Sequence, residues 1–162
     1  MKDWDVRPPE IRTLFNPAFC GLVLARGIKG YYQETSESMP YSLSLLILPL
    51  CLHKRTRDQV LDNNRSYFTK ILEAYPEIRV NFAQRTRGLL PYSMEALAFL
   101  MKCNSIEVDD NGSIFLNEDG IMKTIKGSQD TQDCQKAAKL IGKKFGKIND
   151  KVTIYTSLGV KP

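Results

Sequence analysis

Residues 93–116 read SMEALAFLMKCNSIEVDDNGSIFL, and within this stretch the apolar period changes from helical to alternating. The first half, capped by Ser93, predicts a helix over 94–103. The second half predicts two short strands over 106–116, because apolar and polar residues alternate on both sides of the turn sequence DDNG. A helix followed directly by a β-hairpin therefore decides the predicted fold.

The register of the hairpin follows from placing its apolar residues on one face. In that register Val108 pairs with Ile114, and Ile106 pairs with Leu116. This pairing requires a three-residue loop, in which Gly112 takes the left-handed conformation.

Two further helices are predicted ahead of residue 93. Ser66 caps the first, Pro76 begins the second, and Pro91 ends it. The order helix, helix, helix, hairpin is typical of a winged-helix unit, here over 65–120. A generic α+β arrangement fits the same pattern equally well.

The N-terminal part, residues 8–60, is predicted to be helical. A short helix over 8–14 precedes a longer one, for which Asn16 is the cap and Pro17 the first residue. The longer helix contains three interior glycines, Gly21, Gly27 and Gly30. Since each glycine costs about 1 kcal/mol relative to alanine, we expect another element to approach this helix closely; a ligand site is the less favoured explanation.

The apolar segment 40–52 is predicted to be a central buried helix with a kink or break at Pro49. A polar connection over 54–64 is expected to follow it. The C-terminal part, 130–162, is predicted to contain an amphipathic helix over 131–147 and then a strand or extended arm over 152–155. Together these parts predict one mainly helical α+β domain over 1–162.

The composition of the 162-residue chain excludes several classes of protein. With 43% hydrophobic and 25% charged residues, the chain is neither disordered nor of low complexity. Its longest apolar stretch is too short for a membrane span, and Met1–Asp5 is too acidic and polar for a signal peptide. The four cysteines stand singly, without CxxC spacing, which favours reduced thiols and a cytoplasmic location.

The net charge of +5 is unevenly distributed. Residues 51–90 carry eight cations and four carboxylates, and residues 121–151 carry eight cations and three carboxylates. Between them, residues 91–120 carry one cation and six carboxylates. This pattern permits contact with nucleic acid but is equally usual for a solvated surface.

Residue types that support catalysis are scarce. His53 is the only histidine, and no carboxylate cluster accompanies it in the sequence. No P-loop or Gly-x-Ser-x-Gly elbow is present. We therefore predict no catalytic residue, no metal site, no cofactor and no enzyme activity, and we expect His53 to be structural or part of an interface.

Sequence reading of DNA by the predicted winged helix is disfavoured. The helix over 94–103 has only two charged residues, and the hairpin region that follows carries acidic residues alone: Glu107, Asp109, Asp110, Glu118 and Asp119. Because that helix is apolar on every face, its own domain or another protein must cover it. Contact with the phosphate backbone remains possible through six candidate cations, Lys54, Arg55, Lys136, Lys139, Lys143 and Lys147.

Three motifs carry a resemblance to a known family. They are NPAFCG at 16–21, LILPLCLHKRTR at 46–57 and IYTSLGVKP at 154–162, together with the opening at 4–8. In this order they resemble the middle component of three-component ABC systems, the small third subunit of Lamassu-type bacterial anti-phage and anti-plasmid defence.

The resemblance implies a non-catalytic adaptor. Its expected partners are an SMC-like or Rad50-like ABC ATPase and an effector nuclease, with DNA as a further component of the complex and no membrane. The positions carried over as candidate partner-binding residues are Asn16, Pro17, Phe19, Pro49, His53, Arg57, Tyr155 and Gly159. Two alternatives are an autonomous winged-helix DNA-binding regulator that uses the basic helix, and a small hydrolase built around His53.

Overall fold

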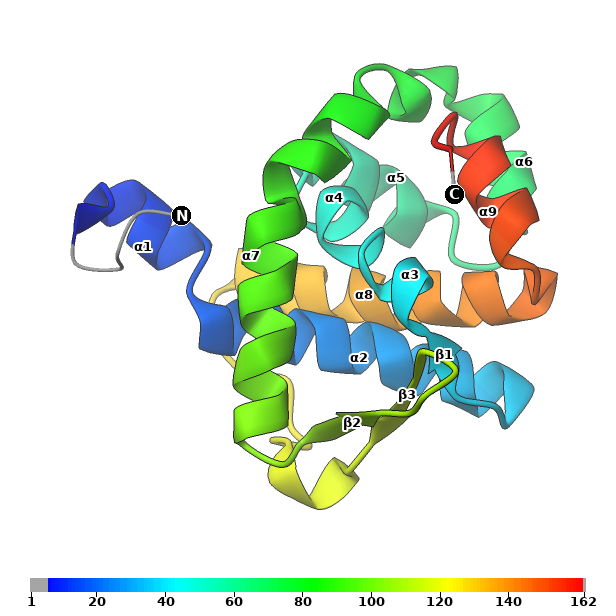
Figure 1. Cartoon of the computed structure of the whole chain (residues 1–162). Coiled ribbons are helices and arrows are strands. Elements are labelled where there is room, and N and C mark those ends of the chain that lie inside the picture. The colour runs from blue at the N-terminus through cyan, green and yellow to red at the C-terminus, as the bar shows by residue number, and fades with distance from the viewer. Residues whose placement is uncertain (1–5, 162) are drawn as a thin grey trace.

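The computed structural model describes residues 6–161 as a mainly helical α+β protein with one small antiparallel sheet (Figure 1). The predicted fold class is confirmed at this level. Residues 1–5 and Pro162 lie outside the described part. The expectation about a signal peptide, and the beginning and end of the sequence resemblance, therefore fall outside it too.

The described part contains three long helices, together with shorter helices and three short strands. The α-helices are α1 (Pro9–Leu14), α2 (Pro17–Thr35), α3 (Tyr41–Ser44), α4 (Ile47–Cys51), α5 (Lys54–Asp62), α6 (Phe68–Ala74), α7 (Phe82–Lys102), α8 (Gln129–Ile148) and α9 (Lys151–Ser157). The 3-10 helices are η2 (Pro76–Arg79) and η3 (Glu118–Gly120). The strands are β1 (Met39–Pro40), β2 (Ile106–Val108) and β3 (Ser113–Leu116).

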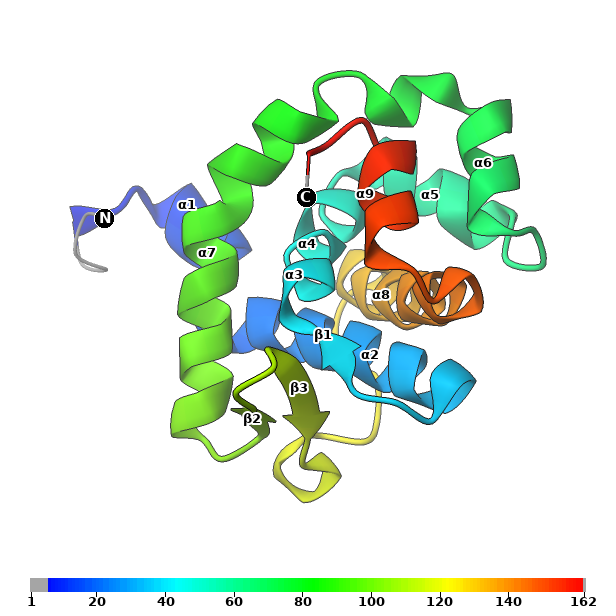
Figure 2. The ribbon, with the colours of Figure 1, turned by 45° about the vertical axis from the view of Figure 1, so that its right-hand side comes forward.

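Two long helices from opposite ends of the chain, α2 and α8, lie side by side (Figures 1 and 2). A methyl group on Gly30 would lie 2.9 Å from the carbonyl carbon of Lys139 and closer still to its oxygen. A methyl group on Gly142 would lie 2.8 Å from the carbonyl carbon of Gly27. The glycines therefore allow the two backbones to touch, which confirms the predicted close approach to this helix.

The central apolar segment is buried, as predicted, but it is not one continuous helix. It forms α3 and α4, which are separated at Leu45 and Leu46. The interruption lies one turn before Pro49, because proline has no N–H for the carbonyl of Leu45 and its ring clashes with that group. Pro49 itself lies inside α4 and is buried.

The hairpin has the predicted register. Val108 pairs with Ile114 and Ile106 with Leu116, and Gly112 has a φ of 73°. The sheet has a third strand that the sequence analysis did not predict. Strand β1 pairs with β3 and gives the order β1-β3-β2, so residues from outside 65–120 complete the sheet.

The helices ahead of the hairpin differ from the expected three. Helix α7 continues through Pro91, and Ser93 is buried within it rather than capping a new helix. Because Pro91 and Arg87 are both exposed, water can solvate the Arg87 carbonyl that lacks a helical partner. Ser66 does not cap α6 either, since the N-cap position is Tyr67 and it makes no side-chain cap bond. The expected winged-helix-like arrangement of 65–120 is therefore not observed in that form.

Two other segments were assigned the wrong structure from sequence. The expected polar connection after residue 53 is mostly helix α5, and the expected strand at 152–155 is helix α9. Each helix begins at a side-chain cap. His53 accepts a hydrogen bond from the backbone N–H of Thr56, and Asp150 accepts one from Thr153 at 2.9 Å. The basic amphipathic helix is confirmed as α8.

The three expected parts of the chain share one hydrophobic core. Leu24 from α2, Leu97 from α7 and Ile141 from α8 all belong to the same cluster of buried side chains. Helix α1, in contrast, has no buried residue. It is connected to α7 by stacking of Phe15 on Tyr92, whose ring centroids lie 4.3 Å apart. Within 6–161 no helix combines the length and hydrophobicity needed to cross a membrane.

Candidate partner-binding surfaces

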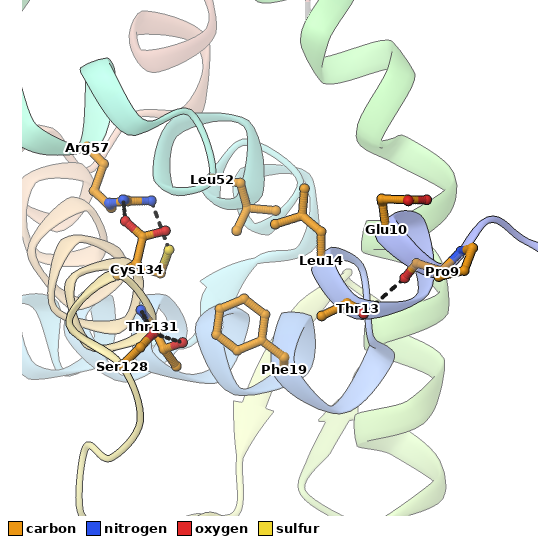
Figure 3. Close-up of a pocket in the computed structure, with 11 residues that line it drawn as sticks. Pro9, Glu10, Thr13, Leu14, Phe19, Leu52, Arg57, Ser128, Thr131 and Cys134 are labelled. Atoms are coloured by element: carbon orange, nitrogen blue, oxygen red, sulfur yellow. Dashed lines mark hydrogen bonds and ion pairs between the residues drawn. The ribbon is translucent and has the colours of Figure 1, made fainter.

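Two of the three resemblance motifs meet at one pocket (Figure 3). The pocket has a volume of about 660 Å³ and opens between α1 and the first turns of α2, α5 and α8. One wall is apolar and includes Phe19 and Leu52, while the opposite wall holds Arg57 and the beginning of α8. The complete lining is Pro9, Glu10, Thr13, Leu14, Phe19, Leu52, Arg57, Ser128, Asp130, Thr131 and Cys134.

Arg57 is only 2% exposed, and its guanidinium is held by contacts within the chain. It donates to the carbonyl oxygen of Cys51 at 3.2 Å, to Sγ of Cys134 at 3.1 Å and to the carboxylate of Asp130. The Nε atom is buried, makes no hydrogen bond with any described residue, and lies 3.9 Å from a carboxylate oxygen of Asp58. These contacts join α5 to the N-terminus of α8, so Arg57 positions two walls of the pocket.

The other residues of these motifs shape the same region. Asn16 accepts a hydrogen bond from the backbone N–H of Ala18 at 2.8 Å, and Pro17 opens the helix that carries Phe19. Pro49 is buried in α4 and is not part of the lining. Three carried-over positions, Pro49, Arg57 and Tyr155, are buried in the protein.

The thiols near this pocket are poor nucleophiles. Burial raises the pKa of the Cys134 thiol, although Arg57 opposes this effect. Burial, with a contribution from nearby negative charge, raises the pKa of Cys20 to about 12. Cys51 is fully buried, and its pKa is also raised. These three cysteines are therefore protonated at neutral pH, whereas Cys103 is exposed.

His53 is exposed and acts as the N-cap of α5. Its Nδ1 lies 2.8 Å from Oγ1 of Thr56 and accepts from the Thr56 backbone N–H at 3.4 Å. Partial burial and the positive charges of Arg85 and Arg55 lower the pKa of His53. This setting keeps the imidazole neutral with Nδ1 as an acceptor, which suits a structural cap.

The C-terminal motif lines a second hollow. This hollow, the α7 groove, has a volume of about 460 Å³ and is lined by residues from the N-terminal half of α7 and from the end of the chain. Tyr155 donates from its hydroxyl to the carbonyl oxygen of Ser42 at 2.7 Å. Gly159 has a φ of 71°, and no atom lies within 4 Å of the position that a Cβ would occupy. The complete lining is Leu45, Ala83, Thr86, Arg87, Leu90, Tyr155, Gly159, Val160 and Lys161.

Helix α7 has an uncovered apolar face that continues from the groove. Leu90, Met94 and Met101 are 38%, 46% and 39% exposed, respectively. With Ala98, which is also exposed, they recur at helical spacing. The core covers only one side of this helix. Of the two kinds of cover expected from the sequence, its own domain or another protein, the domain therefore supplies only one side.

The candidate DNA-contacting cations fall into two groups. Lys54 pairs with Asp58 at 3.0 Å and Arg55 pairs with Glu77 at 3.0 Å, so each already has a carboxylate partner. The lysines on α8 have no ion pair with any described residue, and all four are at least partly exposed: Lys136, Lys139, Lys143 and Lys147. The hairpin acids lie on a different surface, where Glu118 pairs with Lys29 at 2.6 Å.

Sequence reasoning missed several buried cations, among them Arg26 and Lys144. Arg26 donates to the carbonyl oxygen of Met122 and to Oε1 of Gln135 at 3.3 Å, and burial lowers its pKa. Lys144 donates to carbonyl oxygens of the loop at 63–66. Burial lowers the pKa of Lys144, and repulsion from the neighbouring Lys147 lowers it by a smaller amount. The helical spacing of Arg26 and Lys144 relative to the apolar residues of α2 and α8 could have indicated that both face the core. Their hydrogen-bond partners depend on the tertiary fold.

Fold and surface together define a mainly helical α+β protein whose candidate sites are open hollows and an uncovered helix face. In the part of the chain that the structure describes, no group of three His, Cys, Asp or Glu side chains could hold a metal ion. The chain belongs to the ABC-three component (ABC-3C) system Middle Component 3 family, whose model matches residues 4–162. No curated protein and no solved structure matches it. A middle component of a multi-component system has protein partners.

Proposed function

We propose that this protein is a non-catalytic adaptor that connects an SMC-like or Rad50-like ABC ATPase to an effector nuclease in a bacterial defence complex of the cytoplasm. Membership of the middle-component family supports this proposal, as does the sequence resemblance to Lamassu-type systems. The observation that carries it is the uncovered apolar face of α7.

The energetics of this face favour association. Leu90, Met94 and Met101 each leave about two fifths of their surface in water. Covering all three would contribute on the order of 2 kcal/mol, since full burial of one such side chain contributes about 1.5–3 kcal/mol. A partner helix that packs on this face would gain that energy without any change in the core.

The local chemistry also supports a binding role over catalysis. His53 is used as a helix cap, and the thiol in the larger pocket is protonated. The hydrolase alternative requires His53 as an acid or base. Retained activity of the complex with His53→Gln would therefore exclude that alternative.

The test is copurification of the protein with the products of its neighbouring genes. We expect an SMC-like ATPase to copurify with the wild-type chain and to be lost from the double variant Met94→Lys/Met101→Lys. The control is Met122→Lys, which introduces one lysine at a 59%-exposed methionine outside α7. The single variants Met94→Lys and Met101→Lys, which each add the same charge as this control, are measured beside it. Circular dichroism of all variants checks folding.

Two results would contradict the adaptor proposal. One is a wild-type chain that remains monomeric in the presence of the neighbouring gene products. The other is a double variant that is folded and copurifies with the ATPase as well as the control does.

A second candidate function is contact with the DNA backbone through α8, and the unpaired lysines on that helix favour it. Such contact releases counterions and therefore weakens steeply with salt. Replacing Lys136 and Lys139 with glutamate should weaken binding of duplex DNA and reduce its salt dependence. Sequence-specific binding that survives moderate salt would instead favour the autonomous regulator.

A further inference from the structure

We propose that the α7 groove binds a segment of the partner protein that carries a carboxylate beside apolar side chains. This inference rests on the proposed adaptor function and specifies the chemistry of its partner. The groove is hollowed next to the uncovered face of α7, and Leu90 belongs to both. A partner helix can therefore enter the groove and continue along α7.

The walls of the groove are largely apolar. Ala83 and Leu90 contribute from α7, Leu45 from the break between α3 and α4, and Val160 from the end of the chain. The position beside Gly159 is open, so a partner side chain has room there. Tyr155 is held by its hydrogen bond to Ser42 and forms a fixed wall.

The charge of the groove has one sign. Arg87 and Lys161 are exposed lining residues, and no Asp or Glu from the described residues 6–161 lines the groove. The side chains of Arg87 and Lys161 have no ion pair or hydrogen bond with any residue from 6 to 161, whereas Lys54 and Arg55 have carboxylate partners within the chain. Two unpaired cations above an apolar floor are complementary to a carboxylate next to an apolar side chain.

A third group in the groove supports a polar contact. The hydroxyl of Thr86 is buried and has no hydrogen-bond partner among the described residues, although Thr86 lines the hollow. A buried hydroxyl without a partner is costly, so a bound segment that supplies a donor or acceptor gains energy there. The groove thus offers an apolar floor, a positive rim and one unsatisfied polar atom.

The dimensions fit a helical partner. The exposed side chains from Leu90 to Met101 extend the groove by about 16 Å along α7, at 1.5 Å for each residue. About three turns of a partner helix cover that length. DNA is a poorer fit, because two cations on an apolar floor give few phosphate contacts.

The test compares two charge reversals of equal size in the full chain. Arg87→Glu/Lys161→Glu changes the groove, whereas Lys123→Glu/Lys126→Glu changes two exposed lysines in the loop before α8. Binding to the purified ATPase that copurifies with the wild-type chain is measured by biolayer interferometry. We expect the groove variant to raise Kd at least tenfold and the control to change it less than threefold.

A charge swap tests the carboxylate directly. Acidic residues of the ATPase are replaced by lysine one at a time. At one of these positions the substitution should restore binding to the groove variant and weaken binding to the wild-type chain. Binding by the groove variant within threefold of wild type would overturn this inference and leave the adaptor proposal standing. Absence of any ATPase binding by the wild-type chain would overturn both.

A second copy of this chain is the competing occupant, because its acidic hairpin could meet the same cations. Sedimentation velocity of the isolated protein distinguishes the two. A monomer for both the wild type and the groove variant agrees with a partner protein. A wild-type dimer that the groove variant abolishes would assign the groove to self-association and overturn the proposal.

Discussion

Replacement of Gly30 by alanine tests whether the backbones of α2 and α8 touch as tightly as the structure indicates. The added methyl group would lie within 3.0 Å of the Lys139 carbonyl carbon and oxygen. These are backbone atoms of a buried helix, so no side chain can rotate away. The two helices must separate by about 1 Å to restore an ordinary contact distance of 3.4 Å or more.

The expected magnitude combines two opposing effects. Overpacking a well-packed core costs about 3 kcal/mol at the upper end of its usual range. Alanine in place of an interior helical glycine contributes about 1 kcal/mol in the other direction. We therefore expect Gly30→Ala to lower the free energy of unfolding by about 2 kcal/mol and the Tm by about 4–8 °C.

Gly88→Ala is the matched control. Gly88 is an exposed residue within α7, and no atom lies within 4 Å of the position of its missing Cβ. The same substitution should there raise the free energy of unfolding by about 0.5–1 kcal/mol, since only the helix propensity changes. Urea and thermal unfolding measure both variants. A Gly30→Ala protein as stable as Gly88→Ala would refute the close packing of α2 on α8.

Three further predictions concern single side chains. His53→Ala should lower the free energy of unfolding by about 1 kcal/mol, because α5 loses its N-cap. The pKa of His53 is lowered in the folded state, so the stability that the wild-type cap contributes is present above about pH 6.5 and is lost as the pH falls. His53→Asn should remove this pH dependence, as urea titrations at several pH values can determine. Asp130→Ala should cost about 1–2 kcal/mol in thermal unfolding, because Asp130 is itself 69% exposed and the buried Arg57 keeps the more distant carboxylate of Asp58 at 3.9 Å; a neutral effect would contradict the assigned pair. Maleimide should label the exposed Cys103 rapidly in the native protein and the buried Cys20 only after unfolding. Mass spectrometry of the labelled peptides measures both reactions. Rapid labelling of Cys20 in the native protein would contradict its burial.

Features fixed by local pattern were predictable from the sequence. The pairing of Val108 with Ile114 follows from alternation, and the φ of Gly112 follows from the loop length. The interior glycines of α2 indicated close packing, because three such residues in one helix are otherwise too costly. The identity of the partner helix, α8, required the tertiary structure.

Helix boundaries at prolines were predicted less well. The effect of a proline depends on whether water can reach the carbonyl four residues earlier. Pro91 lies on an exposed side of α7 and is tolerated, whereas Pro49 lies in the core and coincides with a break one turn before it. The sequence pattern treats these two prolines alike. The caps of α5 and α9 were also missed, because a cap is recognised only when the following residues are known to be helical.

Some residues of the candidate sites were identified from the sequence, and others were recognised only in the structure. Tyr155 and Gly159 were identified by resemblance, and both line the α7 groove. Arg87 and Lys161 were not identified, because they are 74 positions apart and only the fold places them on one groove. From the sequence, the helix over 94–103 was expected to be covered on both sides by its own domain or by another protein; in the structure its own domain covers one side.

The packing of α4 against α8 has a consequence for synthesis of the protein. The apolar helix α4 needs α8 as part of its cover, yet α8 ends about 100 residues later in the chain. At ribosomal rates of about 5–20 residues per second, that delay is roughly 5–20 s. During this interval the nascent chain displays its most apolar segment to the cytosol, so holdase chaperones have a defined binding site and a defined time in which to act on it.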